Sequence, residues 1–372
     1  MKKLLLLLAL VVYQWSAFGQ NLPVDANATN KTKALYANLK AISGKGMLFG
    51  HQDDLAYGVG WKDEKGRSDV KDVCGSYPAL YGWDVSGLGK LVNIDSVNFD
   101  NMKSWIIEGF KRGGVNTISW HMDNPATGGN SWDNTPAVSS ILPGGEKHEF
   151  YKKRLDLFAD FLNDLNVGLF RTKIPIIFRP FHEHTGSWFW WGKGNCTADE
   201  YKALWQFTVK YLRDEKNIHQ LLYSYSTDQF DSKEQYLEFY PGDDYVDIIA
   251  FDDYHSIKNV DEREKLAFRL HSVVEIAKSK NKVAAFSETG LEKIPIADWF
   301  TKILLDGIKS DQLGKQIAYV MVWRNGRPDH FYAPYPGHPS VTDFIKFRKD
   351  PYTLFEDDLP NMYKMPKFIA EK

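Results

Sequence analysis

The sequence is poor in cysteine and carries almost no net charge. Cys74 and Cys196 are the only cysteines among 372 residues, and the formal net charge is −2 at pH 7. A framework of several disulfide bonds is therefore excluded, although one bond between the two cysteines stays open in an exported protein. A charge so near zero, without a basic stripe, gives no reason to expect a nucleic acid as partner.

Long apolar runs are absent beyond the N-terminus. Residues 1–19 combine Lys2 and Lys3, the unbroken apolar run Leu4–Tyr13 and the small-residue box Ala17–Gly19. This pattern is typical of a secretory signal peptide and is too short for a membrane anchor. We therefore expect an exported protein, periplasmic or secreted and not inserted in a membrane. No repeat or linker divides residues 20–372, so we expect them to form one domain.

Aromatic residues, in contrast, are plentiful. They make up 15% of the chain and include twelve tryptophans. A large core would account for such a surplus, and so would a ligand cleft lined with rings.

Short apolar runs alternate with amphipathic stretches along the chain. Eight runs predict strands: Lys45–His51, Pro78–Asp84, Val115–His121, Ile174–Phe181, Leu221–Ser226, Val246–Asp252, Val283–Glu288 and Ile317–Trp323. Helical spacing marks Asn27–Ser43, Glu149–Leu165, Ala198–Leu212, Arg263–Ala277 and Ile296–Ile308, and is weakest between the fifth and sixth strands. The strands are continuously apolar, as expected when both sides are covered. Eight such units predict a (β/α)8 TIM barrel, an α/β fold of one domain.

Two glutamates follow predicted strands. Glu183 comes after the fourth strand, among histidines and aromatic residues. These neighbours would raise the pKa of its carboxyl, and a raised pKa is what a general acid needs at neutral pH. A salt bridge from Glu183 to Arg179 is the alternative, although Pro180 and the alternation of faces along a strand argue against it. Glu288 ends the seventh strand, across the barrel from the fourth. Two carboxylates about 5–5.5 Å apart are what a retaining glycosidase needs, whereas a helix cap or a loop ion pair is the alternative for Glu288.

Several motifs give the chain a family resemblance. It is similar to the β-mannanases of glycoside hydrolase family 26 in "GHQDD", "SWHMDNP", "FRPFHEHTGSWFWWG", "IIAFDDYH", "AFSETG" and "VMVWRNG". A histidine before the acid, His182, favours this family over a related barrel family that has asparagine there. The resemblance implies retaining hydrolysis of β-1,4-mannosidic bonds in mannan, galactomannan or glucomannan. Glu183 would be the acid/base and Glu288 the nucleophile, with neither a metal nor an organic cofactor.

The resemblance also assigns substrate contacts. His182 and Trp188 match residues beside the cleaved bond, and Tyr254 matches a tyrosine that hydrogen-bonds the nucleophile. His121 and Trp323 match residues that hold the sugar on the non-reducing side. The chain departs from the family at His184-Thr185, where Met-Asn is frequent, and this puts the leaving-group subsite in doubt.

Other functions stay open on sequence alone. A metal-dependent barrel hydrolase could draw ligands from His51, His121, His182, His184, Asp123 and Asp252, but neither His-x-His after the first strand nor HExxH is present. A sugar-binding protein without turnover would have a similar cleft. Xylan or mixed-linkage glucan could replace mannan as substrate. Endo or exo action and the oligomeric state also stay open.

Overall fold

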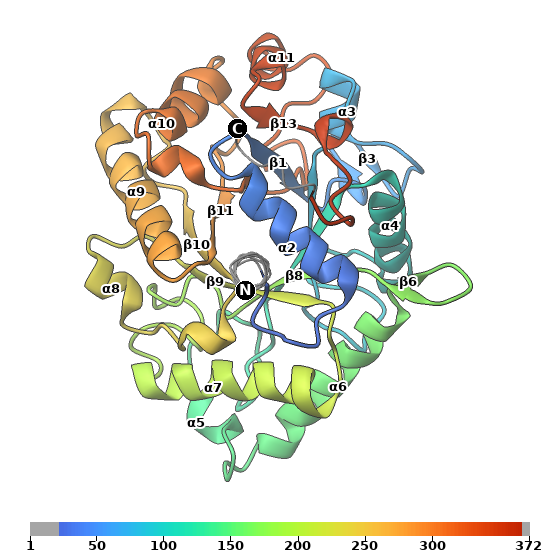
Figure 1. Ribbon diagram of the computed structural model, residues 1–372, viewed down its shortest axis with the longest axis vertical. Coiled ribbons are helices and arrows are strands. Elements are labelled where there is room, and N and C mark those ends of the chain that lie inside the picture. Colours follow the sequence, from blue (N-terminus) through green and yellow to red (C-terminus); the bar gives the residue numbers. More distant parts are fainter. Residues whose placement is uncertain (1–21, 367–372) are drawn as a thin grey trace, which may run out of the picture.

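The computed structural model describes residues 22–366, in which eight parallel strands close into a barrel (Figure 1). The strands are β1 (Met47–Gln52), β4 (Leu80–Asp84), β5 (Val115–Trp120), β8 (Ile176–Pro180), β9 (Leu221–Thr227), β10 (Ile248–Asp253), β11 (Val283–Thr289) and β12 (Tyr319–Val322). Each pairs with the next in this order, and β12 pairs with β1 to complete the ring. The predicted strands and the single-domain (β/α)8 barrel are thus confirmed.

Helices surround the barrel on its outer side. The longer ones are α2 (Asn30–Ile42), α4 (Phe99–Arg112), α6 (His148–Asp164), α7 (Ala198–Lys210), α9 (Arg263–Ser279) and α11 (Val341–Lys349). After β9, where the helical pattern was weakest, the structure has the short α8 (Lys233–Leu237) and a 3-10 helix at Asp243–Tyr245. The helix predicted over Ile296–Ile308 differs, because it begins as a π-helix at Phe300–Leu305 and continues as α10 (Asp306–Lys309).

Local sequence signals fix the ends of these helices. The hydroxyl of Thr197 accepts a hydrogen bond from the Glu200 backbone N–H, and the Glu200 carboxylate accepts one from Thr197 in return, so a capping box begins α7. Asn98 caps the start of α4 through its side chain. Gly113, at φ 108°, ends α4 in a left-handed conformation that other residues adopt at a cost.

The barrel interior changes from apolar to polar along its axis. Inward-facing apolar side chains of the strands pack with the inner face of α2, which lies across the near end of the barrel in Figure 1. They include Leu48, Leu80, Val115, Ile177, Leu222, Ile248 and Val283. At the carboxyl ends of the strands, Asp84, Ser119, Ser226 and Asp252 are buried instead. This polar end is the face on which a TIM barrel carries its chemistry.

Three expectations concern export: a signal peptide, the lack of a membrane-spanning segment and a possible disulfide bond. The predicted signal peptide, residues 1–19, lies outside the described residues. Among residues 22–366, no helix has both the length and the apolar character needed to cross a bilayer. Cys74 and Cys196 are both free thiols, so the disulfide bond that the sequence left open is not formed.

Candidate active site at the carboxyl ends of the strands

Glu183 lies in a tight turn directly after β8. Both Glu183 (φ 55°) and Phe181 (φ 49°) adopt left-handed backbone conformations, which are uncommon for residues with side chains. The backbone N–H of Glu183 donates to the carbonyl of Ser226 on β9 at 3.0 Å, which anchors the turn to the neighbouring strand. Strain of this kind persists where the surroundings fix the conformation, and it gathers at functional sites.

A β-bulge directs Glu288 toward the barrel mouth. Phe251 of β10 pairs with Phe286 of β11, but Asp252 pairs with Glu288, so Ser287 is an extra residue in β11. With regular alternation, Glu288 would face outward with Phe286, whose ring stacks on Phe251 between strands and helices. The bulge turns both Ser287 and Glu288 inward, and bulges beside active sites commonly re-aim side chains in this way.

Both carboxylate oxygens of Glu288 are held by donors. The hydroxyl of Tyr254 donates to Oε1 at 2.7 Å, and the guanidinium of Arg179 pairs with Oε2. Arg179 is fully buried and also binds Asp252 at 2.7 Å. Burial disfavours the charged guanidinium, but the two carboxylates outweigh this and raise the pKa of Arg179. Sequence reasoning considered Arg179 only as a partner of Glu183, whereas it fixes Glu288.

Glu183 experiences the opposite environment. Burial raises the pKa of this carboxyl well above its ordinary value, and the negative charges of Glu288, Asp252 and Asp228 add to the effect. The indole N–H of Trp188 donates to Oε2 of Glu183 at 2.8 Å and acts in the opposite direction, by stabilising the carboxylate. The site therefore contains one carboxyl that favours its protonated form and another held by a cation and a hydroxyl.

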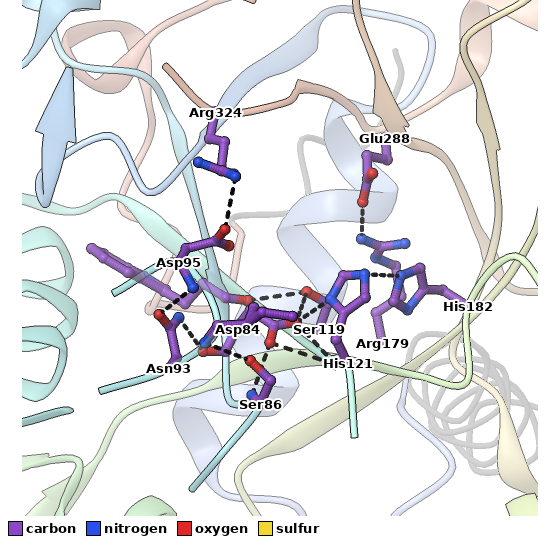
Figure 2. A network of polar contacts seen from close by, with 12 residues as sticks. Asp84, Ser86, Asn93, Asp95, Ser119, His121, Arg179, His182, Glu288 and Arg324 are labelled. Carbon is purple, nitrogen blue, oxygen red and sulfur yellow. Dashed lines mark hydrogen bonds and ion pairs between the residues drawn. The ribbon is translucent and has the colours of Figure 1, made fainter. Parts of the chain in front are cut away.

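A group of polar side chains lies beside the ion pair of Glu288 and Arg179 (Figure 2). Nδ1 of His121 lies 2.8 Å from Asp84, and its Nε2 lies 3.3 Å from Nε2 of His182. Burial opposes charge on His121, but Asp84 outweighs it and the pKa of His121 is raised. Burial and then the charge of Arg179 lower the pKa of His182 well below its ordinary value. The raised pKa of His121 and the lowered pKa of His182 favour His121 as the donor in this contact.

Exposed aromatic rings flank this group. Trp188 is 38% exposed, whereas Phe189, Trp190 and Trp191 are buried behind it. Trp132, which sequence reasoning did not select, is 49% exposed and stacks on His121 at a centroid distance of 5.3 Å. Trp132 lies in the long Gly- and Asn-rich loop after β5, and this position could have indicated a role in the site. Half-buried Trp323 meets His121 edge to face at 6.2 Å.

Comparison with known proteins identifies the family. The sequence model of glycosyl hydrolase family 26 matches residues 24–326. The chain belongs to this family. Among solved structures, it resembles a GH26 β-mannanase from Bacteroides ovatus, with 44% sequence identity, a TM-score of 0.88, and coverage of 92% of this chain and 100% of that chain.

Two curated relatives share the name mannan endo-1,4-β-mannosidase. A mannan endo-1,4-β-mannosidase from Bifidobacterium adolescentis is 34% identical over 355 residues, which cover 87% of this chain and 34% of the relative. One from Bacillus subtilis is 29% identical and covers 72% of this chain and 73% of the relative. The chain thus spans about a third of the length of the Bifidobacterium adolescentis protein.

Within the family 26 barrel, His184 lies in the core rather than at the mouth. It is fully buried, with Nε2 2.8 Å from the hydroxyl of Tyr225 and Nδ1 3.1 Å from that of Tyr201. Burial lowers the pKa of His184 to about 3, so it is neutral near pH 7. His184 stands where the family frequently has the methionine of Met-Asn. This difference therefore lies in a buried layer behind Glu183.

The residues considered as metal ligands are dispersed. His51 pairs with Asp54 at 2.8 Å, and Asp123 forms a surface ion pair with Lys90 at 3.1 Å. Across residues 22–366, no three side chains of histidine, cysteine, aspartate or glutamate converge in a group that could hold a metal ion. His121 and His182 face each other, and Asp252 binds Arg179.

Proposed function

We propose that the protein is a retaining glycoside hydrolase that cleaves β-1,4-mannosidic bonds in mannan, galactomannan or glucomannan. The contrast between Glu183 and Glu288 carries this proposal. One carboxyl, at the end of β8, has a pKa raised by burial, and the other, at the end of β11, is held by Tyr254 and Arg179. The mannanase names of the family 26 relatives support mannan as the substrate.

The reaction follows from these two environments. Glu183, in its protonated form, donates its proton to the glycosidic oxygen while a carboxylate oxygen of Glu288 attacks the anomeric carbon. The leaving sugar departs and a glycosyl-enzyme forms. Glu183, now deprotonated, takes a proton from water as the water attacks the anomeric carbon, and Glu288 leaves. Two inversions give net retention of configuration.

Sugar recognition is assigned to the residues around the carboxylates. The exposed indoles of Trp188 and Trp132 offer faces for the apolar side of a pyranose ring. His182 would meet the sugar beside the cleaved bond, and His121 and Trp323, which contact each other, would meet the sugar on the non-reducing side. Residues 20–372 form the catalytic domain in this proposal.

The decisive experiment measures products from mannan, galactomannan, xylan and mixed-linkage glucan. We expect reducing ends from the mannans only, and Glu183→Gln and Glu288→Gln to lower turnover by orders of magnitude with unchanged circular dichroism. Glu292→Gln changes an exposed carboxylate in the loop that follows β11; it is the matched control and keeps its activity. Near-normal turnover in either active-site variant contradicts the proposal, and so does a first product of inverted configuration.

Export is a separate proposal that depends on the sequence of residues 1–19. Their basic start, apolar run and small-residue box fit a cleaved leader. Mass spectrometry of protein recovered outside the cytoplasm should find an N-terminus at or near residue 20. An intact N-terminus on intracellular protein contradicts it.

A further inference from the structure

A buried arginine lies behind the turn that carries Tyr254. Arg269 belongs to the second turn of α9, the helix that follows β10 on the outer side of the barrel (Figure 1). It is 3% exposed, and arginines are rarely buried so fully unless they are paired. The amino end of α9 faces the carboxyl ends of the strands, and long side chains of a helix point toward its amino end. The guanidinium of Arg269 therefore reaches back toward the candidate active site.

Each nitrogen of this guanidinium contacts the loops after β9 and β10. Nε donates to the carbonyl of Phe230 at 3.0 Å, and Nη2 lies 3.3 Å from the Asp231 carboxylate, both in the loop after β9. Nη1 donates to the Asp253 carboxylate at 2.6 Å and to the Ser256 hydroxyl at 2.5 Å. A planar fork of donors can serve acceptors in several directions at once, which a single ammonium does not do. Arg269 thus joins the two loops.

Asp253 transmits this constraint to the backbone around Tyr254. One oxygen of its carboxylate, Oδ2, pairs with Arg269. The other, Oδ1, accepts hydrogen bonds from the backbone N–H groups of His255 and Ser256 at 2.8 Å and 2.9 Å. The side chain of Asp253 therefore closes an Asx turn over Tyr254. While Arg269 holds Oδ2, the carboxylate cannot rotate away from the two N–H groups.

The same turn is tied to the strand that carries Glu288. The hydroxyl of Thr289, the residue after Glu288, donates to the backbone carbonyl of Asp253 at 2.7 Å. The hydroxyl of Tyr254 donates to Oε1 of Glu288 at 2.7 Å. A displacement of the turn would change this second contact, and a misplacement of about 1 Å at a reacting group can cost about 100-fold in rate.

Stability alone does not account for this arginine. A buried ion pair contributes little net stability compared with well-packed apolar residues of similar size. The acceptors of Arg269, from Phe230 to Ser256, all lie in the two loops at the mouth of the barrel. Its contacts therefore serve the geometry of those loops.

We propose that Arg269 is a positioning residue for the reaction, which fixes the turn 253–256 and thereby holds the Tyr254 hydroxyl on Glu288. It acts through Tyr254 and touches neither Glu183 nor the substrate. This inference depends on the proposed function, because that function makes Glu288 the nucleophile. The loss of activity from changing Arg269 cannot exceed the loss from removing the Tyr254 hydroxyl itself.

A double-mutant cycle tests the inference. Arg269→Lys keeps a positive charge beside Asp253 but cannot serve all the acceptors. We expect kcat/KM on mannan to fall about threefold to tenfold, mainly through kcat, because the nucleophile is less well oriented. In the Tyr254→Phe background the same change should cost less than about twofold, since the hydroxyl that Arg269 positions is already absent. A purely structural role would cost the same factor in both backgrounds.

A second substrate distinguishes the nucleophile from the acid. The leaving group of dinitrophenyl β-mannobioside departs without a proton from Glu183, so a loss that acts through Glu288 should persist on it at about threefold to tenfold. Arg112→Lys is the matched control. Arg112 pairs with Glu356 at 3.0 Å and donates to the Tyr81 hydroxyl at 2.7 Å, at the amino ends of the strands. This control should lower stability to urea and leave kcat/KM within about twofold.

The outcomes separate this inference from the proposed function. Unchanged activity of Arg269→Lys overturns the inference, and so does an equal loss in both backgrounds. A loss confined to mannan also overturns it, because the effect then concerns Glu183. If Arg269→Lys fails to fold, Arg269→Met combined with Asp253→Asn, which leaves no buried charge unpaired, enters the same cycle.

If the unaltered protein cleaves neither substrate, the proposed function fails instead. Hydrogen exchange at the backbone N–H groups of His255 and Ser256 then decides whether Arg269 holds the turn. The inference requires faster exchange in Arg269→Lys than in the unaltered protein, and equal rates overturn it.

Discussion

The hydroxyl of Tyr254 donates a 2.7 Å hydrogen bond to Oε1 of Glu288, whose other oxygen pairs with Arg179. The two donors come from β8 and from the turn after β10, so two other units of the barrel hold the carboxylate that β11 carries. Neither of its oxygens can rotate without losing a partner. The carboxylate is therefore oriented before any substrate arrives, which lowers the cost of reaching the attacking geometry.

Tyr254→Phe tests the value of this orientation. A hydrogen bond to a charged group contributes about 1.5–3 kcal/mol, so we expect kcat/KM on mannan to fall about 10-fold to 100-fold. Tyr332→Phe is the matched control, because the ring of Tyr332 lies 5.9 Å from that of Tyr254 and its change leaves this hydrogen bond in place. Equal activity of the two variants would show that Arg179 alone holds Glu288.

Trp188→Phe should move the alkaline limb of the pH profile. The indole N–H stabilises the Glu183 carboxylate and thus lowers a pKa that burial raises. Without that donor the pKa rises further, the acid stays protonated to higher pH, and the alkaline limb of kcat/KM moves upward. Profiles on an aryl mannobioside measure this shift. Trp132→Phe, which alters the ring on His121, should leave the limb in place.

The barrel and the positions of Glu183 and Glu288 at strand ends could be predicted because their signals are local. Apolar strands, amphipathic helices and polar residues at the strand ends follow from side-chain periodicity and from the geometry of a closed sheet. The direction of Glu288 could not be predicted. Counting residues along β11 places it on the outer face, and only the extra residue Ser287 in the pairing with β10 turns it inward.

Non-local contacts account for the other misses. Arg179 was considered with Glu183, four residues away, but its partners Asp252 and Glu288 come from strands far along the chain. The His184 imidazole lies in the core because Tyr225 and Tyr201, from β9 and α7, both reach it. Tertiary packing sets such pairings, and residue spacing carries no signal for them.

The two thiols should react slowly in the folded protein. Burial raises the pKa of Cys74 to about 11 and that of Cys196 to about 12, so both are protonated and nearly unreactive at pH 8. We expect iodoacetamide to modify neither thiol within minutes under native conditions, and both after unfolding without reductant. Mass spectrometry counts the adducts. If neither thiol is modified in the unfolded protein, the two cysteines form a disulfide bond.

Asp84 should stabilise the fold most at mildly acidic pH. The pKa of His121 is raised in the folded protein, chiefly because Asp84 outweighs the effect of burial. The stability from this protonation is therefore complete below the pKa of an unfolded histidine, about 6.5, and is lost as the pH rises through the folded pKa. In Asp84→Asn, burial dominates instead, the folded pKa falls, and the variant loses stability as the pH drops below about 6.5.

The loss in Asp84→Asn should consequently depend on pH in a definite direction. Breaking a buried pair costs about 3–5 kcal/mol, which we expect at pH 6, and the loss should be smaller at pH 9, because a higher pH favours deprotonated His121. Urea unfolding at the two pH values measures the difference. Asp123→Asn removes an exposed partner of Lys90 and should cost less than about 1 kcal/mol at either pH. An Asp84→Asn loss that is equal at pH 6 and pH 9 would mean that His121 is neutral throughout, and that Asp84 acts only as a hydrogen-bond acceptor.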